Sequence, residues 1–336
     1  MNFELTEEQI AVRDAAREFA QTKLLPGVIE RDENQTFPTE QIKELGELGF
    51  LGMMVDPKYG GSGMDAVSYV LAMEELSKVD ASCSVVVSVN NSLVCWGLET
   101  FGSEEQKEKY LSKTADGIIA SYCVTEPDAG SDVRAIKTEA IKEGDEYIVN
   151  GSKMWITGAM HAEWFFVLAY TEKKSGYHGM SGFIIDADSK GIELGKKESN
   201  MGQRCSDTRS VTFNNVRVPE ENLIGGKENE GWMNAMLAFD HSRPAISAHA
   251  VGNARGAMEE SLAYSKERKT MGKPIFKHQA ISFMIADMAT KIEAARLLCW
   301  KAAMTLDEGN RNTLEAAHAK RFAGDICMEV TTDAVQ

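Results

Sequence analysis

Residues 146–157, EYIVNGSKMWIT, mark the part of the chain where a strand pattern replaces a helical one. β-branched and aromatic residues cluster here, and the hydrophobic period shortens towards two, which is typical of strands. The Asn150-Gly151 pair tolerates the positive φ angles of a type I′ turn. The segment therefore predicts a β-hairpin with one arm over 146–149 and the other over 152–157.

The strand pattern extends on both sides of this segment, from about Ile118 to Leu223. Further strands are expected over 164–170, 181–185 and 210–218, because each is an apolar, β-branched or aromatic run. The sequence thus predicts a β domain that lies between two helical regions.

The region before Gly117 has a helical pattern. Thr6 followed by Gln9 is a capping-box signature that opens a first helix. The apolar face of this helix carries Val12, Ala16 and Phe19. Further helices are expected over 38–48, 66–79 and 104–112.

The helical period returns after Gly231. A seam of apolar residues spaced by alternating fours and threes predicts a bundle of long antiparallel helices. The seam consists of Ile281, Ile285, Met288, Ile292, Ala295 and Cys299. The last helix begins near Thr313 and reaches Gln336 without a Gly, Pro or basic stop signal, so we expect the bundle to continue beyond this residue.

The expected fold class is therefore α+β and multidomain. A helical domain is expected over 1–117, a middle β domain over 118–230, and a helical bundle that lacks its last helices over 231–336.

Composition narrows the possible partners. The net charge of −15 argues against nucleic acid or anionic lipid as the main ligand. The N-terminus has no apolar signal core, and no apolar run approaches the roughly 18 residues of a membrane span. The six cysteines lack CxxC spacing, which predicts free thiols, and no histidine pair has metal-ligand spacing. We expect a cytoplasmic protein, or one of an organelle matrix if a targeting segment has been removed.

Residues 121–132, SYCVTEPDAGSD, predict a strand that leads into a loop of small residues. Free backbone N–H groups and the hydroxyls of Thr125 and Ser131 suit a diphosphate or the oxygens of a ring. The alternative is an ordinary turn in which Asp132 caps the next element.

Residues 154–157, MWIT, place Trp155 and Thr157 on one face of a strand, because side chains alternate. A large ring beside a hydroxyl suits an aromatic heterocycle that needs stacking and one hydrogen bond. A core tryptophan is the alternative.

Two further segments admit two interpretations each. The basic run 266–273, KERKTMGK, either complements a helix C-terminus or anchors an anionic ligand, with His278 and Gln279 as further donors. The run 239–244, FDHSRP, contains either an Asp–Arg ion pair or a site for adenine and phosphate.

Taken together, six segments resemble the acyl-CoA dehydrogenase family in family order and over the whole chain. They are YCVTEPDAGSD (122–132), KMWIT (153–157), NMGQRCSDTRS (200–210), AFDHSRP (238–244), ERKTMGKPI (267–275) and HQAISFMIADMA (278–289). The resemblance implies an FAD-dependent enzyme of fatty-acid β-oxidation that passes electrons to an electron-transferring flavoprotein.

The resemblance also implies site residues. FAD would be bound by Tyr122, Cys123, Val124, Thr125, Gly130, Ser131, Trp155, Ile156 and Thr157, with Thr125 and Thr157 on the ring and Trp155 against it. Arg268, Thr270, His278 and Gln279 would reach the FAD of a neighbouring subunit, which implies a homotetramer built as a dimer of dimers. Ser131, Asp240 and Arg243 would hold the CoA moiety, and Phe239 would lie along the acyl channel.

In this family a Glu carboxylate removes the α-proton of the thioester while the β-hydrogen leaves as hydride to the flavin. Most members carry this Glu downstream of a motif whose Gln matches Gln336. A minority supply it from the position of Ser242, which is not an acid. We therefore assign no catalytic base within residues 1–336 and expect it beyond Gln336.

The substrate implied is a short- to medium-chain acyl-CoA, oxidised to trans-2-enoyl-CoA. Segment 200–210 resembles medium-chain members, whereas VVSVNNSL (86–93), the expected floor of the acyl pocket, resembles short-chain members. Two alternatives stay open: a non-catalytic subunit that binds flavin or a CoA ester, and an acyl-CoA oxidase that uses oxygen as acceptor.

Overall fold

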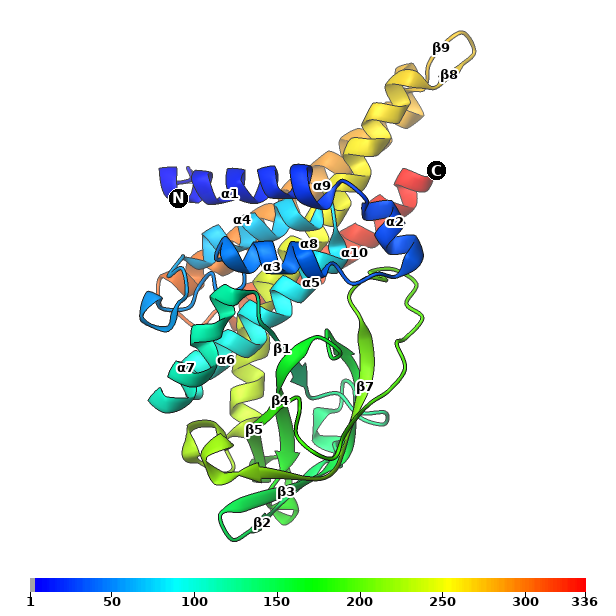
Figure 1. Cartoon of the computed structure of the whole chain (residues 1–336). Helices are drawn as coiled ribbons and strands as arrows, with labels where there is room; N and C mark the ends of the chain where they lie inside the picture. Colours follow the sequence, from blue (N-terminus) through cyan, green and yellow to red (C-terminus); the bar gives the residue numbers. More distant parts are fainter. Residues whose placement is uncertain (1–3) are drawn as a thin grey trace. The chain divides into compact units, whose positions relative to one another are not determined.

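The computed structural model describes residues 4–336, which form two compact units (Figure 1). The helical unit comprises the chain up to Val28, Asp65–Val85 and Asp240–Gln336. The β-containing unit comprises Ile29–Met64 and Val86–Phe239. Helical, β and helical regions follow one another along the chain, as the sequence predicts, and the fold class is confirmed.

Long helices build most of the helical unit. They are α1 (Glu7–Phe19), α4 (Ala66–Ser77), α9 (Gln279–Asp307), α10 (Thr313–Val335) and the greater part of α8 (Gly231–Glu267). The short strands β8 (Lys269–Thr270) and β9 (Lys273–Pro274) form a hairpin at the tip of the arm made by α8 and α9 (Figure 1).

Local capping interactions set where these helices begin. The Thr6 hydroxyl accepts the Gln9 N–H at 3.2 Å and the Gln9 side chain accepts the Thr6 N–H at 3.0 Å, which confirms the capping box of α1. Asp307, at the end of α9, accepts the N–H groups of Ala66 and Val67 at the start of α4. One carboxylate thus satisfies two of the donors that the first turn of a helix leaves open.

Four members of the predicted seam form the core of the bundle. Met288, Ile292, Ala295 and Cys299 are buried against small and branched residues of α10, whereas Ile281 and Ile285 nearer the start of α9 are half-buried. The partners in α10 are Ala319, Ala323, Ile326 and Val330.

One curled sheet dominates the β-containing unit. Its strands are β1 (Ile119–Cys123), β2 (Glu139–Glu143), β3 (Glu146–Thr157), β4 (Ala162–Tyr170), β5 (Met180–Asp186), β6 (Ile192–Leu194) and β7 (Thr208–Pro219). The order is β1-β4-β2-β3-β7-β6, and β5 pairs with β4. The helical elements of this unit include α3 (Thr39–Glu47), α6 (Trp96–Phe101), α7 (Glu104–Tyr110) and the π-helical η3 (Val89–Cys95).

Strand β4 is buried on both faces. Trp164, Phe166 and Leu168 pack into the core that the sheet shares with the helical segments of its unit. The residues between them, Phe165 and Val167, pack into a second core on the opposite face. A strand with two apolar faces lies inside a fold and not at its surface, which explains its continuous apolar sequence.

The predicted hairpin turn at Asn150-Gly151 is wrong. β3 runs without interruption from Glu146 to Thr157, and Asn150-Gly151 lies at a register shift in its pairing with β7. The turn lies instead between β2 and β3, at Gly144 with φ +65°. Gly151 is needed for close approach, because a Cβ atom here would lie 2.2 Å from the Thr138 hydroxyl.

One long apolar helix differs from the sequence expectation. The continuous helical run Ala81–Phe101 has the length and hydropathy to cross a membrane, but 67% of its most apolar window is buried within the protein. Such burial is also found in the core helices of proteins that cross no membrane.

All six cysteines are free thiols, as predicted. Cys83, Cys95, Cys123, Cys205 and Cys299 are buried, and Cys327 is half-buried. Burial raises the pKa of the Cys95, Cys123 and Cys299 thiols far above the ordinary value. These thiols are therefore protonated at neutral pH.

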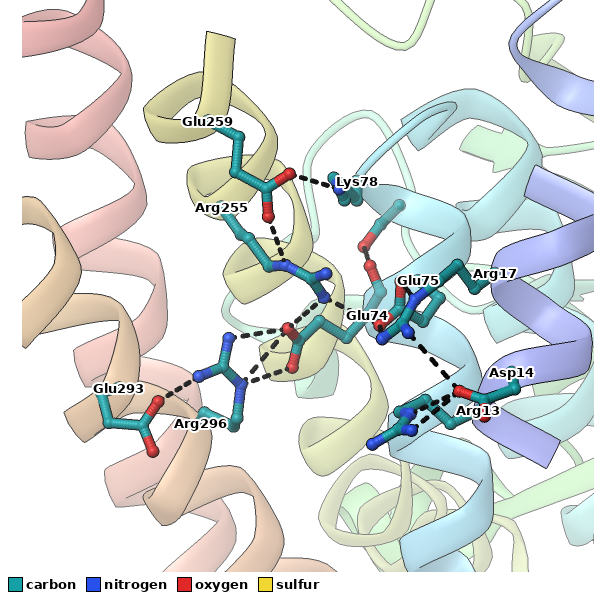
Figure 2. A network of polar contacts seen from close by, with 11 residues as sticks. Arg13, Asp14, Arg17, Glu74, Glu75, Lys78, Arg255, Glu259, Glu293 and Arg296 are labelled. Atoms are coloured by element: carbon teal, nitrogen blue, oxygen red, sulfur yellow. Dashed lines mark hydrogen bonds and ion pairs between the residues drawn. The ribbon is translucent and has the colours of Figure 1, made fainter. Parts of the chain in front are cut away.

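A network of buried charges joins four helices of the helical unit (Figure 2). Glu74 and Glu75 of α4 are nearly inaccessible to solvent. Arg255 of α8 contacts both carboxylates, at 2.9 and 2.8 Å. Arg17 of α1 pairs with Glu75 and Arg296 of α9 pairs with Glu74, each at 2.9 Å. Burial acts to raise the pKa of Glu75, but the hydrogen bonds from Arg17 and Arg255 hold it below the usual value.

The first prediction concerns this network. Arg255→Met should lower the free energy of unfolding by about 3–5 kcal/mol, because two buried carboxylates lose a shared cation. Urea denaturation measures the change. Arg321→Met is the matched control: Arg321 is 82% exposed and pairs with Asp325 at the surface, so the change should be within about 0.5 kcal/mol. Equal losses in the two variants would contradict the prediction.

The second prediction concerns pH. His249 is buried, with its Nδ1 3.0 Å from the Ser84 hydroxyl, and burial lowers its pKa to about 4. In the unfolded chain, the His249 imidazole takes up a proton near pH 6.5, whereas in the folded protein it stays neutral until about pH 4. Stability should therefore fall by up to about 3 kcal/mol as the pH drops from about 6.5 to about 4. His249→Gln should flatten this slope in urea titrations at several pH values, and an unchanged slope would refute the assignment.

Candidate functional site

The first group of predicted residues lies where β1 and β3 end in the β-containing unit. Two hydrogen bonds hold these ends together: the Ser121 hydroxyl donates to the Thr157 carbonyl at 2.7 Å, and the Met154 N–H donates to the Thr125 carbonyl at 2.8 Å. The structure therefore places the SYCVTEPDAGSD loop beside the KMWIT strand, although about 30 residues separate them in sequence.

Tyr122 carries an unsatisfied hydroxyl. Its ring stacks on Phe166 at 4.4 Å and meets Phe239 edge-on at 6.1 Å. Within the described residues its buried hydroxyl has no hydrogen-bond partner. Since buried polar atoms are nearly always paired, this donor is available to a bound cofactor.

Trp155 lies at the surface on a strained backbone. Its φ is +61°, within a register shift of the β3–β7 ladder between Lys153 and Ile156, and its side chain is 56% exposed. Ile156 is buried and Thr157 is half-buried, so Trp155 and Thr157 lie on the side opposite Ile156. The alternative of a core tryptophan is wrong. Such bulges and left-handed residues concentrate at functional sites.

The loop after β1 is open to solvent at its tip. Cys123 and Val124 are buried, Thr125 is half-buried, and Gly130 and Ser131 are exposed. A Cβ atom at Gly130 would meet nothing within 4 Å. The Asp132 side chain makes no capping hydrogen bond, so the alternative of a capping role is wrong.

The second group lies in the helical unit. Arg268, Thr270 and Gln279 are exposed around the β8–β9 hairpin, and the Thr270 hydroxyl lies 3.1 Å from Nε2 of the half-buried His278. Met271, at the tip of the hairpin, is 93% exposed with φ +50°.

Asp240 and Arg243 form the ion pair that the sequence allowed. Asp240 also accepts the Thr313 hydroxyl at 2.5 Å and an Arg311 N–H at 3.3 Å. This buried carboxylate is therefore engaged by side chains of its own unit and fixes the half-buried Arg243. Phe239, one residue earlier, is half-buried.

Sequence analysis missed one ion pair beside the first group of residues, in the β-containing unit. Lys153 and Glu126 form a buried ion pair at 2.9 Å, directly beside Thr125 and Met154. Both residues lie inside recognised motifs, but their position there says nothing about burial.

These features fit FAD. A flat exposed ring, an unpaired hydroxyl and an open stretch of backbone supply stacking and hydrogen bonding for a large heterocycle and its phosphate chain.

Comparison with known proteins agrees with this geometry. Models of the N-terminal, middle and C-terminal domains of acyl-CoA dehydrogenases match residues 6–118, 121–216 and 229–336. The short-chain-specific acyl-CoA dehydrogenase of Clostridium acetobutylicum is 44% identical over 337 residues, which cover all of this chain and 89% of the relative. A probable mitochondrial medium-chain-specific enzyme of Caenorhabditis briggsae is 44% identical over 94% of this chain and 78% of its own length.

Solved structures are equally similar. Butyryl-CoA dehydrogenase of Megasphaera elsdenii superposes with a TM-score of 0.97 at 42% identity, covering 100% of this chain and 89% of that one. A chain from a structure described as the electron transferring flavoprotein of Acidaminococcus fermentans gives a TM-score of 0.98 at 47% identity, covering 100% and 88%.

The fold and the site thus define a flavin-dependent oxidoreductase that uses FAD. More specifically, the chain belongs to the acyl-CoA dehydrogenase family, and the resemblance stated from its motifs is confirmed.

The third prediction uses the backbone strain at Trp155. Trp155→Gly and Trp155→Ala both remove the ring and should both weaken FAD binding. Glycine accepts φ +61° without strain, so the FAD-free Gly variant should be more stable than the Ala variant by about 1–2 kcal/mol. Urea denaturation of the two apoproteins measures the difference. A more stable Ala variant would show that the left-handed backbone is not retained in solution.

Proposed function

We propose that the protein oxidises short- to medium-chain acyl-CoA thioesters to trans-2-enoyl-CoA and passes the electrons to an electron-transferring flavoprotein. The observation that carries this proposal is the exposed Trp155 ring, which lies on a bulge beside the loop after β1. The chain that carries this ring belongs to the acyl-CoA dehydrogenase family. Bound FAD supplies the acceptor for the hydride.

Within this proposal the β-containing unit holds the flavin. Thr125 and Thr157 would hydrogen-bond the ring, Trp155 would lie against it, and Tyr122 would give its unpaired hydroxyl a partner. Gly130 and Ser131, which are exposed, would line the diphosphate. The remaining backbone of this surface would come from Cys123, Val124 and Ile156.

The proposed roles of residues after Leu237 come from the family resemblance, and their charge and exposure suit these roles. Arg243, oriented by Asp240, would meet the anionic CoA moiety, and Phe239, the last residue of the β-containing unit, would line the acyl channel. Arg268, Thr270 and Gln279 are exposed and His278 is half-buried beside Thr270, which suits contact with the FAD of a neighbouring subunit in a homotetramer. The assignment of the proton-abstracting Glu to a position beyond Gln336 stays a prediction.

The π-helix η3 supports the proposed chain length. Val89 and Leu93 pack into the core that also receives Tyr122 and Phe239. The wide turn is held by two buried amides: Asn90 accepts the Ala120 N–H at 2.9 Å and Asn91 accepts the Met53 N–H at 2.7 Å. Short- and medium-chain enzymes are both among the relatives. A floor of the acyl pocket that is held at these two points would suit a limited acyl length.

We also propose the domain limits 1–117, 118–230 and 231–336 and a location in the cytoplasm, or in the mitochondrial matrix. Both bacterial and mitochondrial enzymes are among the relatives.

The fourth prediction tests the function directly. Anaerobic addition of butyryl-CoA or octanoyl-CoA to the intact, FAD-loaded protein should bleach the flavin absorption bands, because the thioester reduces the cofactor. The faster of the two substrates defines the chain-length preference, and added electron-transferring flavoprotein should restore the bands.

Other outcomes point elsewhere. A flavin spectrum that shifts but never bleaches would favour a binding subunit. Reoxidation by oxygen faster than by the flavoprotein would favour an oxidase. Failure to bind FAD would overturn the proposal.

A further inference from the structure

Lys153 is a lysine with no solvent contact. Its side chain is 0% exposed, and its ammonium donates to the Glu126 carboxylate at 2.9 Å, the Leu168 carbonyl at 2.8 Å and the Val124 carbonyl at 3.2 Å. An ammonium has three N–H donors, so all of them are used.

Glu126 is satisfied just as fully. Besides Lys153, its carboxylate accepts the Thr138 hydroxyl at 2.5 Å, the Thr138 N–H at 3.1 Å and the Lys137 N–H at 2.6 Å. Burial acts to raise the pKa of Glu126, but the charge of Lys153 and these donors hold it below the usual value. The pair is thus a closed network and not a buried charge in search of a ligand.

The network fixes three consecutive residues of the loop after β1. Val124 is bound through its carbonyl to Lys153, Thr125 through its carbonyl to the Met154 N–H, and Glu126 through its carboxylate to Lys153. Trp155 is the next residue of the strand. The relative position of Thr125 and Trp155 is therefore set by contacts that all involve residues 153 and 154.

The bulge at Trp155 is what permits this arrangement. Residues two apart on a regular strand face the same side, so a buried Lys153 would be followed by a buried Trp155. The positive φ of Trp155 and the register shift interrupt the alternation, so that the lysine faces inward and the ring faces outward.

Stability alone does not account for this pair. A buried ion pair contributes little compared with apolar residues of the same volume, since desolvation offsets the attraction. A fully satisfied polar network does, however, specify one geometry. We propose that Lys153, paired with Glu126, is a positioning residue that presents Thr125 and Trp155 to FAD. This inference rests on the proposed function, in which these two residues contact the flavin.

The fifth prediction separates positioning from stability. In the intact protein, Lys153→Met leaves Glu126 buried and unpaired, so the melting temperature of the apoprotein should fall. The double variant Lys153→Met, Glu126→Gln removes both charges and should recover most of that loss. In apoprotein titrations, both variants should bind FAD at least about tenfold more weakly than the wild type, and the spectrum of the bound flavin should shift. The reason is that the loop after β1 has lost its contact with Lys153.

Val216→Ala is the matched control. Val216 is fully buried in the sheet core of the same unit and pairs with Val149, seven residues before Ile156 along β3, so this variant should melt at a lower temperature with an unchanged dissociation constant for FAD. If the double variant recovers affinity together with stability, or if Lys153→Met binds FAD as the wild type does, the positioning role is refuted. If the wild-type protein itself binds no FAD, the proposed function fails instead, which is a separate result.

Discussion

The left-handed backbone of Trp155 allows a buried lysine and an exposed indole ring to lie two residues apart on one strand of the β-containing unit. On one side of it, a lysine enters the interior, where every one of its donors is satisfied. On the other, an indole ring is held at the surface. Without the bulge, β3 would have to bury both side chains or expose both, and the loop after β1 would lose its anchor. The site is thus a local exception to strand geometry that the surrounding ladder supports.

The helical unit handles buried charge in a comparable way. Glu74 and Glu75 lie where a bundle would ordinarily place apolar residues, and arginines from three other helices contact them. Since a buried charge is tolerated only when it is paired, each carboxylate also constrains which helices pack there. The apolar seam between α9 and α10 consists largely of alanines and other small residues, which bring helices close but distinguish poorly between alternative registers. The charged network constrains how α1, α4, α8 and α9 pack against one another.

Local patterns predicted the elements well and the contacts poorly. The capping box at Thr6 depends on residues three apart, so the sequence was sufficient to find it. The Asn150-Gly151 turn failed because the same pair that fits a hairpin also fits a bulge inside a long strand. The burial of Lys153 could not be foreseen, because alternation assigns it to the same side as Trp155. Nor could the contact between Arg296 and Glu74 be foreseen, since it joins residues 222 positions apart. The proposed flavin-site residues come from resemblance to a family, and the structure adds which contacts hold them.

The protonated state of the cysteines has a consequence for the chemistry proposed here. A trans-2-enoyl thioester is an electron-poor alkene, and thiolates add readily to such alkenes. Cys123 lies between two residues of the proposed flavin surface, yet it is fully buried in the sheet core on the other face and its raised pKa keeps the sulfur protonated. Because side chains alternate along β1, the Cys123 sulfur lies on the face opposite Tyr122, away from the proposed flavin surface. In the proposed function, the burial of Cys123 would protect its sulfur from alkylation by the product.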